Sequence, residues 1–372
     1  MTKMRAMTTP VHDFAIVGAG IAGTSLAAEL STTSDVVMLE AEDHPGYHAT
    51  GRSAAFWEEC YGGPDIVPLT LASERALRAG GFLNRRGALY IGRGSDHAAL
   101  DSFMQRFAET GATISRIGQS DIAAHIPGIR SEWTGAIWEP ACCDIDVGGL
   151  HAEYLARARR QRAVLHTRFR MAGAARSDGI WTIRSTSGAM VRAQQLVNAA
   201  GAWADEIARL AGCKPVGITP LRRTVIQLRV DRQPPADMPL VLDIGGSFYF
   251  KPEAGRIWLS PHDEAVSQPC DAAPEEMAVA LAIQRLGEVT DWRVQAVERK
   301  WAGLRSFAPD RLPVHGPDSH NPDFIWFAGQ GGSGIQTAPA AARLVAAQML
   351  GNTVPDDLVQ INAAQYASRR FA

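Results

Sequence analysis

The chain has 372 residues, of which 46% are hydrophobic and 20% are charged, a composition typical of a globular protein long enough for two domains. Lys and Arg total 37 against 39 for Asp and Glu, and the resulting formal charge of −2 argues against nucleic acid as a partner. The opening stretch MTKMRAMTTPVHD has no apolar core, and no apolar run approaches the roughly 18 residues of a membrane span. We therefore expect a cytoplasmic protein without a membrane span.

The predicted elements begin with a βαβ unit: a buried strand over Phe14–Val17, a helix to Leu30 and a second strand over Val36–Leu39. Next comes 43–64, a Gly/His/Pro-rich segment whose length and weak periodicity are typical of a functional loop. Further along, the patterns favour a strand at 89–91, helices at 97–109 and 151–162, antiparallel strands within 223–262, a helix at 275–287, strands at 294–301 and 324–328, and a helix at 338–349.

These elements predict an α/β fold, in which a Rossmann-like doubly wound nucleotide-binding domain is interleaved with an antiparallel-sheet α+β substrate domain. The first domain is expected to comprise 11–82, 146–218 and 302–352. The substrate domain is expected to comprise 83–145 and 219–301.

Cysteine and histidine positions give no sign of a metal site or a disulfide framework. The cysteines are odd in number, lack a C-x-x-C pair and are expected to be free thiols at positions 60, 142, 143, 213 and 270. His44 and His48 are four residues apart, but they lie in a Gly/Pro-rich loop without a third ligand. We expect no bound metal.

A glycine turn between the first strand and the first helix predicts dinucleotide binding. Gly18, Gly20 and Gly23 have the G-x-G-x-x-G spacing, which allows a tight turn, close approach of a pyrophosphate and close packing of the helix. Glu40 follows at the end of the second strand, where an acidic side chain accepts hydrogen bonds from an adenosine ribose. The turn alone does not distinguish FAD from NAD, so an NAD-dependent dehydrogenase stays an alternative.

Three further segments favour FAD: TGRSAA at 50–55, LVNAAGAWAD at 196–205, read as a strand, and GQGGSGIQT at 329–337, read as a glycine loop. Together with VGAGIAG, SFYFKP and WAGLRSF, they resemble the D-amino acid oxidase superfamily of FAD enzymes. Within it, the sequence is most similar to the bacterial FAD-dependent D-arginine dehydrogenases. The resemblance runs from about Asp13 to Leu350.

The resemblance implies a noncovalent FAD, because the loop expected at the flavin contains neither cysteine nor histidine. That loop opens a helix, whose dipole would favour negative charge on the reduced flavin. The residues implied in cofactor binding are Gly18, Gly20, Ile21, Ala22, Gly23, Glu40, Ala41, Gly51, Arg52, Ser53, Ala54, Ala55, Met171, Ala200, Gly201, Trp203, Gly331, Gly332, Ser333, Gly334, Ile335 and Gln336.

The resemblance also implies a clamp for a substrate carboxylate, an anion that the planar fork of arginine matches well. Arg305 and Arg223 would hold the carboxylate, Tyr249 and Tyr61 would hydrogen-bond to it, and the Gly332 carbonyl would accept from the amine. Arg222 is adjacent to Arg223 and alternates in face, so only one of the two is expected to point inward.

Departures from the D-arginine enzymes bear on the substrate. Their guanidinium-binding acid falls close to Gly87, and their active-site histidine falls on Phe56, so that Phe56 and Trp57 would form an apolar wall. Glu58 and Glu59 are expected on the solvated surface; the alternative is an inward Glu58 that restores a cation site.

The sequence therefore predicts hydride removal from a D-amino acid with a neutral or aromatic side chain, giving an imino acid and then a 2-oxo acid. Alternatives are a secondary amino acid (sarcosine- or proline-like) or a 2-hydroxy acid on the same fold, and a flavin-binding protein without turnover. The electron acceptor stays open between a quinone, a dye-like carrier and O₂.

Overall fold

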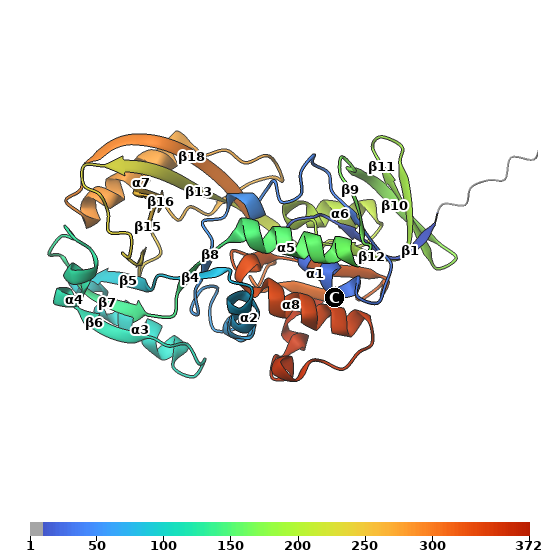
Figure 1. Ribbon diagram of the computed structural model, residues 1–372, viewed down its shortest axis with the longest axis horizontal. Helices are drawn as coiled ribbons and strands as arrows, with labels where there is room; N and C mark the ends of the chain where they lie inside the picture. Colours follow the sequence, from blue (N-terminus) through green and yellow to red (C-terminus); the bar gives the residue numbers. More distant parts are fainter. Residues whose placement is uncertain (1–9) are drawn as a thin grey trace, which may run out of the picture.

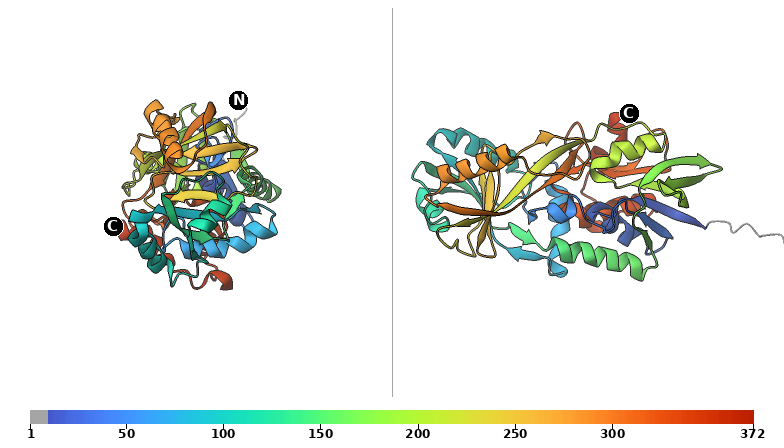
Figure 2. Two further views of the ribbon diagram at one scale, coloured as in Figure 1. Left: turned by 90° about the vertical axis from the view of Figure 1, so that its left-hand side faces the viewer. Right: turned by 90° about the horizontal axis from the view of Figure 1, so that it is seen from above.

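The computed structural model describes residues 10–372. An α/β unit forms one end of the molecule and a large, mainly antiparallel sheet forms the other (Figure 1; Figure 2, right). The absence of an apolar core in the opening stretch concerns residues that lie largely outside the described part of the chain.

The α/β unit is built on an eight-stranded sheet whose central strands are parallel. Strands β2 and β20 are buried along their whole length, which is typical of parallel strands covered on both faces. In spatial order the parallel strands are β9 (Val164–His166), β2 (Val36–Leu39), β1 (Val11–Val17), β12 (Met190–Asn198) and β20 (Phe324–Ala328); the antiparallel additions are β10 (Met171–Ser177), β11 (Ile180–Ser185) and β19 (Val314–Pro317).

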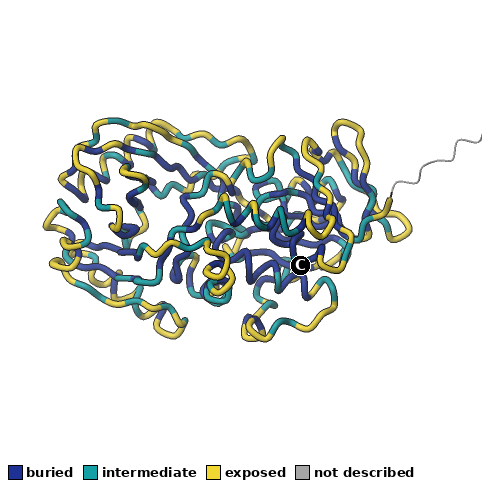
Figure 3. Tube along the Cα trace, in the orientation of Figure 1, coloured by how far each residue is buried: buried dark blue, intermediate teal, exposed yellow. Residues whose placement is uncertain are grey.

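The two faces of this sheet belong to separate hydrophobic clusters, because alternate residues of β1 point to opposite sides. Phe14 and Ile16 pack with the helical layer, whereas Ala15 and Val17 pack with α6 and the β10–β11 hairpin. The helical layer comprises α1 (Ile21–Leu30), α2 (Val67–Ala79), α5 (Val147–Arg160) and α8 (Gly334–Met349), and α6 spans Ala204–Leu210. Buried segments concentrate in this unit (Figure 3).

The second sheet is ten-stranded and antiparallel, except that β14 pairs with β5 in parallel. Its strands in spatial order are β21 (Gln330–Gly331), β18 (Val294–Phe307), β13 (Thr219–Val230), β16 (Arg256–Ser260), β15 (Tyr249–Glu253), β14 (Leu240–Asp243), β5 (Ala88–Arg93), β7 (Trp133–Glu139) and β6 (Ser115–Gly118), with β17 (Ala265–Val266) paired to β13. Helices α3 (His97–Phe107), α4 (Gln119–His125) and α7 (Glu276–Val289) pack on this sheet.

A small sheet lies between the two units and is formed by β3 (Phe56–Trp57), β8 (Cys143–Ile145) and β4 (Leu83–Arg85). Short 3-10 helices complete the described chain at Thr50–Arg52, Gly94–Asp96, Gly201–Trp203, Asp356–Leu358, Ala363–Tyr366 and Ser368–Phe371. All five cysteines are free. Within residues 10–372, no helix combines the length and apolarity needed to cross a bilayer.

The α/β fold class is confirmed, and several boundaries differ from the predictions. The strand predicted at 294–301 continues to Phe307, because its second half pairs with β13 up to Thr219. The domain boundary expected at residue 302 therefore falls inside β18, and the domain division stays a prediction. The final helix begins at Gly334 rather than 338. The strand read in LVNAAGAWAD ends at Asn198, where a helical turn begins the approach to α6.

Candidate active site

The turn after β1 requires glycine for two different reasons. Gly18 has a φ of +99°, and a Cβ there would lie 2.5 Å from the Ala199 carbonyl oxygen. A Cβ on Gly23 would lie 1.9 Å from the Gly18 carbonyl oxygen, so the first turn of α1 packs directly on the turn that precedes it. This backbone brings the N-terminus of α1 to the edge of a groove, the geometry by which such turns bind pyrophosphate.

Glu40 stands at the end of β2 with its carboxylate oriented by the backbone. It accepts hydrogen bonds from the amide nitrogens of Ala19 and Glu42, each at 2.9 Å, and is 8% exposed. Two carboxylate oxygens have about four acceptor sites, so two backbone bonds leave capacity for a ribose. The residue lines the groove in the position expected from the sequence.

The groove runs from the glycine turn to Arg305, and most of the predicted cofactor residues lie on it. On the groove are Gly18, Gly20, Ile21, Ala22, Glu40, Ala41, Arg52, Ser53, Ala54, Met171, Ala200, Gly201, Trp203, Gly331, Gly332, Gly334 and Ile335. Not on it are Gly23 and Gly51, whose backbones pack against neighbouring carbonyls, Ser333, which precedes α8, and Ala55 and Gln336, which line a second, smaller pocket.

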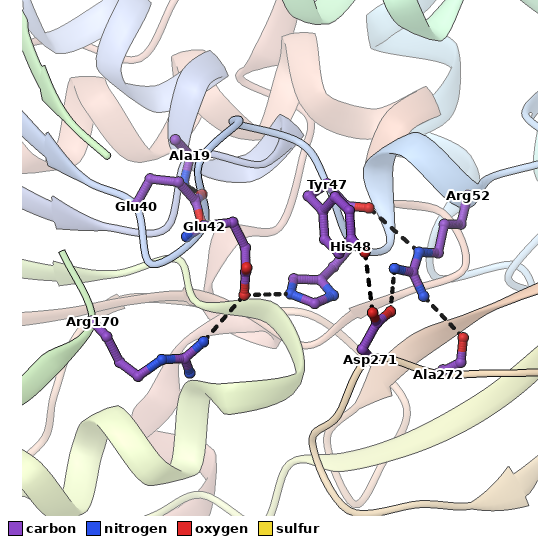
Figure 4. A network of polar contacts seen from close by, with 9 residues as sticks. All are labelled: Ala19, Glu40, Glu42, Tyr47, His48, Arg52, Arg170, Asp271 and Ala272. Carbon is purple, nitrogen blue, oxygen red and sulfur yellow. Dashed lines mark hydrogen bonds and ion pairs between the residues drawn. The ribbon is translucent and has the colours of Figure 1, made fainter. Parts of the chain in front are cut away.

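Several groove residues from the 43–64 segment and from the stretch just before β10 were not predicted from the sequence. Thr50 accepts from the Ile21 amide at 3.0 Å and so ties this segment to the first turn of α1. Glu42 bridges His48, at 3.0 Å, and Arg170, at 3.1 Å (Figure 4). The motif TGRSAA at 50–55 indicated the segment but not which of its side chains face the groove.

Arg52 lines the groove, but its guanidinium is committed to protein oxygens rather than left free for a cofactor phosphate. It donates to the Ala272 carbonyl at 2.9 Å and to the Ala302 carbonyl at 3.1 Å, and it pairs with Asp271 (Figure 4). Tyr47 also donates to Asp271, at 3.1 Å. The Arg52 hydrogen bond holds the pKa of Asp271 below its usual value. Arg52 therefore joins the 43–64 segment to the loop before α7.

Arg223 and Arg305 converge from neighbouring antiparallel strands. Arg223 pairs in register with Gly303 on β18, and Arg305 lies two residues further on, which places the two side chains on one face as diagonal neighbours. Both line the groove. Arg222 points away and pairs with Glu275 at 2.5 Å, so the inward arginine is Arg223.

Polar atoms at this end of the groove are left without partners. The Nη1 of Arg223 and the hydroxyl of Tyr249 are buried and have no hydrogen-bond partner in the described chain. Arg305 donates to the Tyr61 hydroxyl at 2.6 Å. Burial and the charge of Arg305 lower the pKa of Arg223 to about 10, so both guanidiniums are charged at neutral pH. Unpaired buried donors beside two cations fit a planar anion such as a carboxylate.

The small pocket joins this cationic end to the start of α8. Gly332 faces Tyr61 closely, since a Cβ on Gly332 would lie 2.0 Å from the Tyr61 hydroxyl. Phe56 lines the pocket, and its ring meets Tyr249 edge-on at 5.8 Å. The prediction for Trp57 is wrong, because that side chain faces the core and donates to the Thr70 carbonyl.

Two further expectations concerned charge in this region. Gly87 does not reach the pocket; its φ is +82°, and a Cβ there would lie 2.2 Å from the Trp138 ring. The expectation that Glu58 and Glu59 are solvated is wrong, because they are 0% and 5% exposed. Glu58 lines the small pocket, which agrees with the inward position of the alternative, while the cation site stays a prediction.

The fold and this geometry define an α/β dinucleotide-binding protein with an anion clamp at the far end of the groove. The chain belongs to the FAD dependent oxidoreductase (DAO) family, which it matches over residues 13–348. The glycine turn, the oriented Glu40 and the long groove fit FAD, which is the cofactor of this family. The narrower likeness to D-arginine dehydrogenases stays a prediction.

The relatives include human mitochondrial dimethylglycine dehydrogenase, 24% identical over 388 residues that cover 94% of this chain and 44% of that protein. Among solved structures, L-proline dehydrogenase from P. horikoshii superposes with a TM-score of 0.84 at 20% identity, covering 98% of both chains. Iminodiacetate oxidase from Chelativorans sp. BNC1 superposes with a TM-score of 0.78 at 23% identity, covering 95% of this chain and 98% of that one. These structural likenesses show the shared fold. The chain spans about half or less of the first curated relatives it matches.

Proposed function

We propose that the protein oxidises the carbon–nitrogen bond of a small α-amino acid, whose carboxylate is held by Arg223 and Arg305. The observation that carries this proposal is the pair of unsatisfied buried donors, Arg223 Nη1 and the Tyr249 hydroxyl, beside Arg305 at the end of an FAD groove. Arg223 already pairs with Glu264 at 3.2 Å, so a carboxylate there satisfies the two remaining donors and gives buried Arg305 an anionic partner, which it does not have within residues 10–372.

Each residue of the clamp has a separate task in this proposal. The two guanidiniums and the two tyrosines fix the carboxylate, and the Gly332 carbonyl accepts a hydrogen bond from the amine. A carboxylate fixed in this way presents the Cα–H bond in one orientation, which reduces the entropy cost of reaction. The bound FAD supplies the acceptor for the hydride. The imino product hydrolyses in water to a 2-oxo acid and an amine.

We propose a D-amino acid with a neutral or aromatic side chain as the first substrate class. Phe56, Leu242 and Ile335 line the small pocket, and His262 is neutral there because burial lowers its pKa to about 4. A secondary amino acid is the second candidate. It is favoured by the names of the relatives, which include dimethylglycine dehydrogenase, L-proline dehydrogenase and iminodiacetate oxidase.

The test is anaerobic mixing of the FAD-loaded protein with single substrates, with loss of visible flavin absorbance as the signal. The panel contains D- and L-alanine, D- and L-phenylalanine, D- and L-proline, N-methylglycine, glycine and D-lactate. We expect bleaching by a D-amino acid or by a secondary amino acid. Bleaching by lactate alone would replace the amine assignment with a hydroxy acid, and no bleaching by any member would contradict the proposed function. Repeating the productive pair with O₂ or a quinone as the acceptor then separates an oxidase from a dehydrogenase.

A further inference from the structure

Glu58 is an acidic residue in a place where charge is costly. It is 0% exposed, and neither of its carboxyl oxygens has a hydrogen-bond partner within residues 10–372. Buried carboxyl groups in folded proteins are normally paired or hydrogen-bonded, so an orphaned one calls for a functional reason. None of the residues with an assigned role in the clamp accounts for it.

The backbone of Glu58 is held firmly against the start of α8. The side chain of Gln336 accepts from the Glu58 amide and donates to the Glu58 carbonyl, both at 3.2 Å. The side-chain amide of Gln336 also donates to the Thr70 hydroxyl at 2.8 Å, so a third hydrogen bond fixes the orientation of that amide. Gln336 follows Gly332 by about one helical turn, and both residues line the small pocket together with Glu58. Glu58 therefore has a fixed backbone and shares the small pocket with Gly332, whose carbonyl is proposed to hold the substrate amine.

The other acids near Glu58 are already satisfied by the backbone. Glu139, on β7, accepts from the amides of Glu59 at 2.7 Å and Cys60 at 3.4 Å. Glu59 accepts from the Thr113 amide at 2.6 Å. Glu58 is therefore the acid of this cluster whose oxygens are left for a ligand.

Burial, and after it the neighbouring acid Glu139, favour a proton on Glu58 when the pocket is empty. Burial, with the charge of Glu139, raises the pKa of Glu58 well above its usual value, and burial raises that of Glu139 to about 7. Cys60 and Cys142 are neutral because burial raises the pKa of each thiol. The pocket is also lined by Tyr61, Tyr249, neutral His262 and the cation Arg305, which forms no ion pair with Glu58 in the described chain.

We propose that Glu58 is the catalytic residue that accepts a proton from the ammonium group of the substrate, an assignment that rests on the proposed function. An amino acid binds largely as its ammonium form, whose nitrogen has no free lone pair to assist departure of the Cα hydride. The step starts from the ionised form of Glu58: one N–H bond breaks, an O–H bond forms on the Glu58 carboxylate, and the electron pair stays on nitrogen. The step consumes no oxidant or reductant.

Basicity explains why the buried site suits this task. An unperturbed glutamate, with a pKa of about 4.3, is several units less basic than an amine and accepts its proton poorly. A carboxylate whose basicity is raised toward that of the amine accepts the proton far more readily. The cluster around Glu58 provides this increase, and the clamp arginines remain free for the carboxylate.

The experiment compares Glu58→Gln with Glu59→Gln in the FAD-loaded protein. Glu59 is the matched control, because it is the adjacent buried acid and lines neither the groove nor the small pocket. The readout is kcat/KM against pH for the amino acid found in the substrate panel. Below the pKa of the substrate amine we expect Glu58→Gln to lose about 10²- to 10⁴-fold. Above that pKa the variant should approach the wild type, since the amine is already neutral, and Glu59→Gln should follow the wild type throughout.

Two further measurements separate catalysis from pocket structure. The dissociation constant of propanoate, an acid without an amine, is read from the flavin spectrum and should match in wild type and Glu58→Gln. In the wild type, the plot of kcat/KM against pH is compared for an N-alkyl substrate and its fluorinated, less basic analogue. The inflection that reports Glu58 should lie at the same pH for both substrates, and the inflection that reports the amine should differ. This second measurement needs no variant and stands even where Glu58→Gln fails to fold.

Several results would overturn the assignment. An unchanged pH profile in Glu58→Gln would do so, as would a loss that is equal at every pH and accompanied by weaker propanoate binding. A loss confined to substrates with a second positive charge would make Glu58 a side-chain selector instead. If the wild type oxidises no amine, the proposed function fails and takes the Glu58 role with it. If the wild type oxidises an amine and Glu58→Gln has the same pH profile of kcat/KM, only the role proposed for Glu58 is contradicted.

Discussion

The FAD groove and the small pocket differ in how their polar groups are satisfied. At the glycine-turn end of the groove, Glu40 and Thr50 already accept hydrogen bonds from the backbone. In and around the small pocket, Glu58, Tyr249 and Arg223 carry buried atoms without partners. The first region is shaped by backbone geometry to receive a large cofactor. The second holds buried polar atoms without partners, and a bound substrate can supply the missing hydrogen bonds. This difference indicates that the groove binds the cofactor and that the small pocket is where the substrate reacts.

The largest expected effect would break the groove. In Gly18→Ala the new Cβ meets the Ala199 oxygen and the residue keeps a positive φ, which together cost on the order of 2–6 kcal/mol. We expect loss of bound FAD and a lower melting temperature, measured by the visible absorbance per protein and by thermal unfolding. The control is Gly188→Ala, which also has a positive φ but has no atom within 4 Å of its Cβ. Retained FAD in Gly18→Ala would contradict the role given to the turn.

The next effect would break the clamp and leave the groove intact. Arg305→Ala removes a charge-assisted contact worth about 2–5 kcal/mol, so kcat/KM should fall roughly 30- to 5,000-fold, mainly through KM, with FAD retained. Steady-state kinetics and the propanoate dissociation constant measure this loss. Arg222→Ala is the control, because Arg222 pairs with Glu275 on the other face of β13. Equal kinetics for Arg305→Ala and the wild type would remove Arg305 from the clamp.

The smallest effect concerns stability in acid and comes from a buried group that lines neither the groove nor the small pocket. His315 is buried on β19 of the α/β unit, and burial lowers its pKa to about 3, below the unfolded value near 6.5. Because the unfolded chain takes up the proton first, stability from neutral His315 is present above pH 6.5 and is lost as the pH falls toward 3. The loss is at most about 1.4 kcal/mol per pH unit.

His315→Phe should flatten this acid-side slope, because it removes two unpaired ring nitrogens next to Phe327 and Tyr366. Urea unfolding at several pH values measures the slope. His320→Gln, at an exposed position, should leave it unchanged. The same slope in His315→Phe and the wild type would assign acid lability to other groups.

Elements with strong local patterns could be predicted from the sequence, and elements with weak ones could not. The buried strands VVML and FIWFA and the glycine turn between β1 and α1 were correct. The β10–β11 hairpin was missed: β10 (MAGAARS) is largely exposed and has a weak strand pattern, whereas the alternating apolar pattern of β11 (IWTIRS) was overlooked. Helix α2 was also missed, since it follows directly on the irregular 43–64 segment.

The sequence by itself determined the cofactor end of the molecule. A glycine turn and an acid at the end of the next strand are separated by one βαβ unit, so their spacing in the chain sets their spacing in space. The other end was decided by tertiary structure, because Arg223 and Arg305 lie far apart in the chain and meet only through the long pairing of β13 with β18. Glu58 is the clearest case. Adjacent acids are normally solvated, and only the packing of β7, α8 and the 43–64 segment around this one removes it from water.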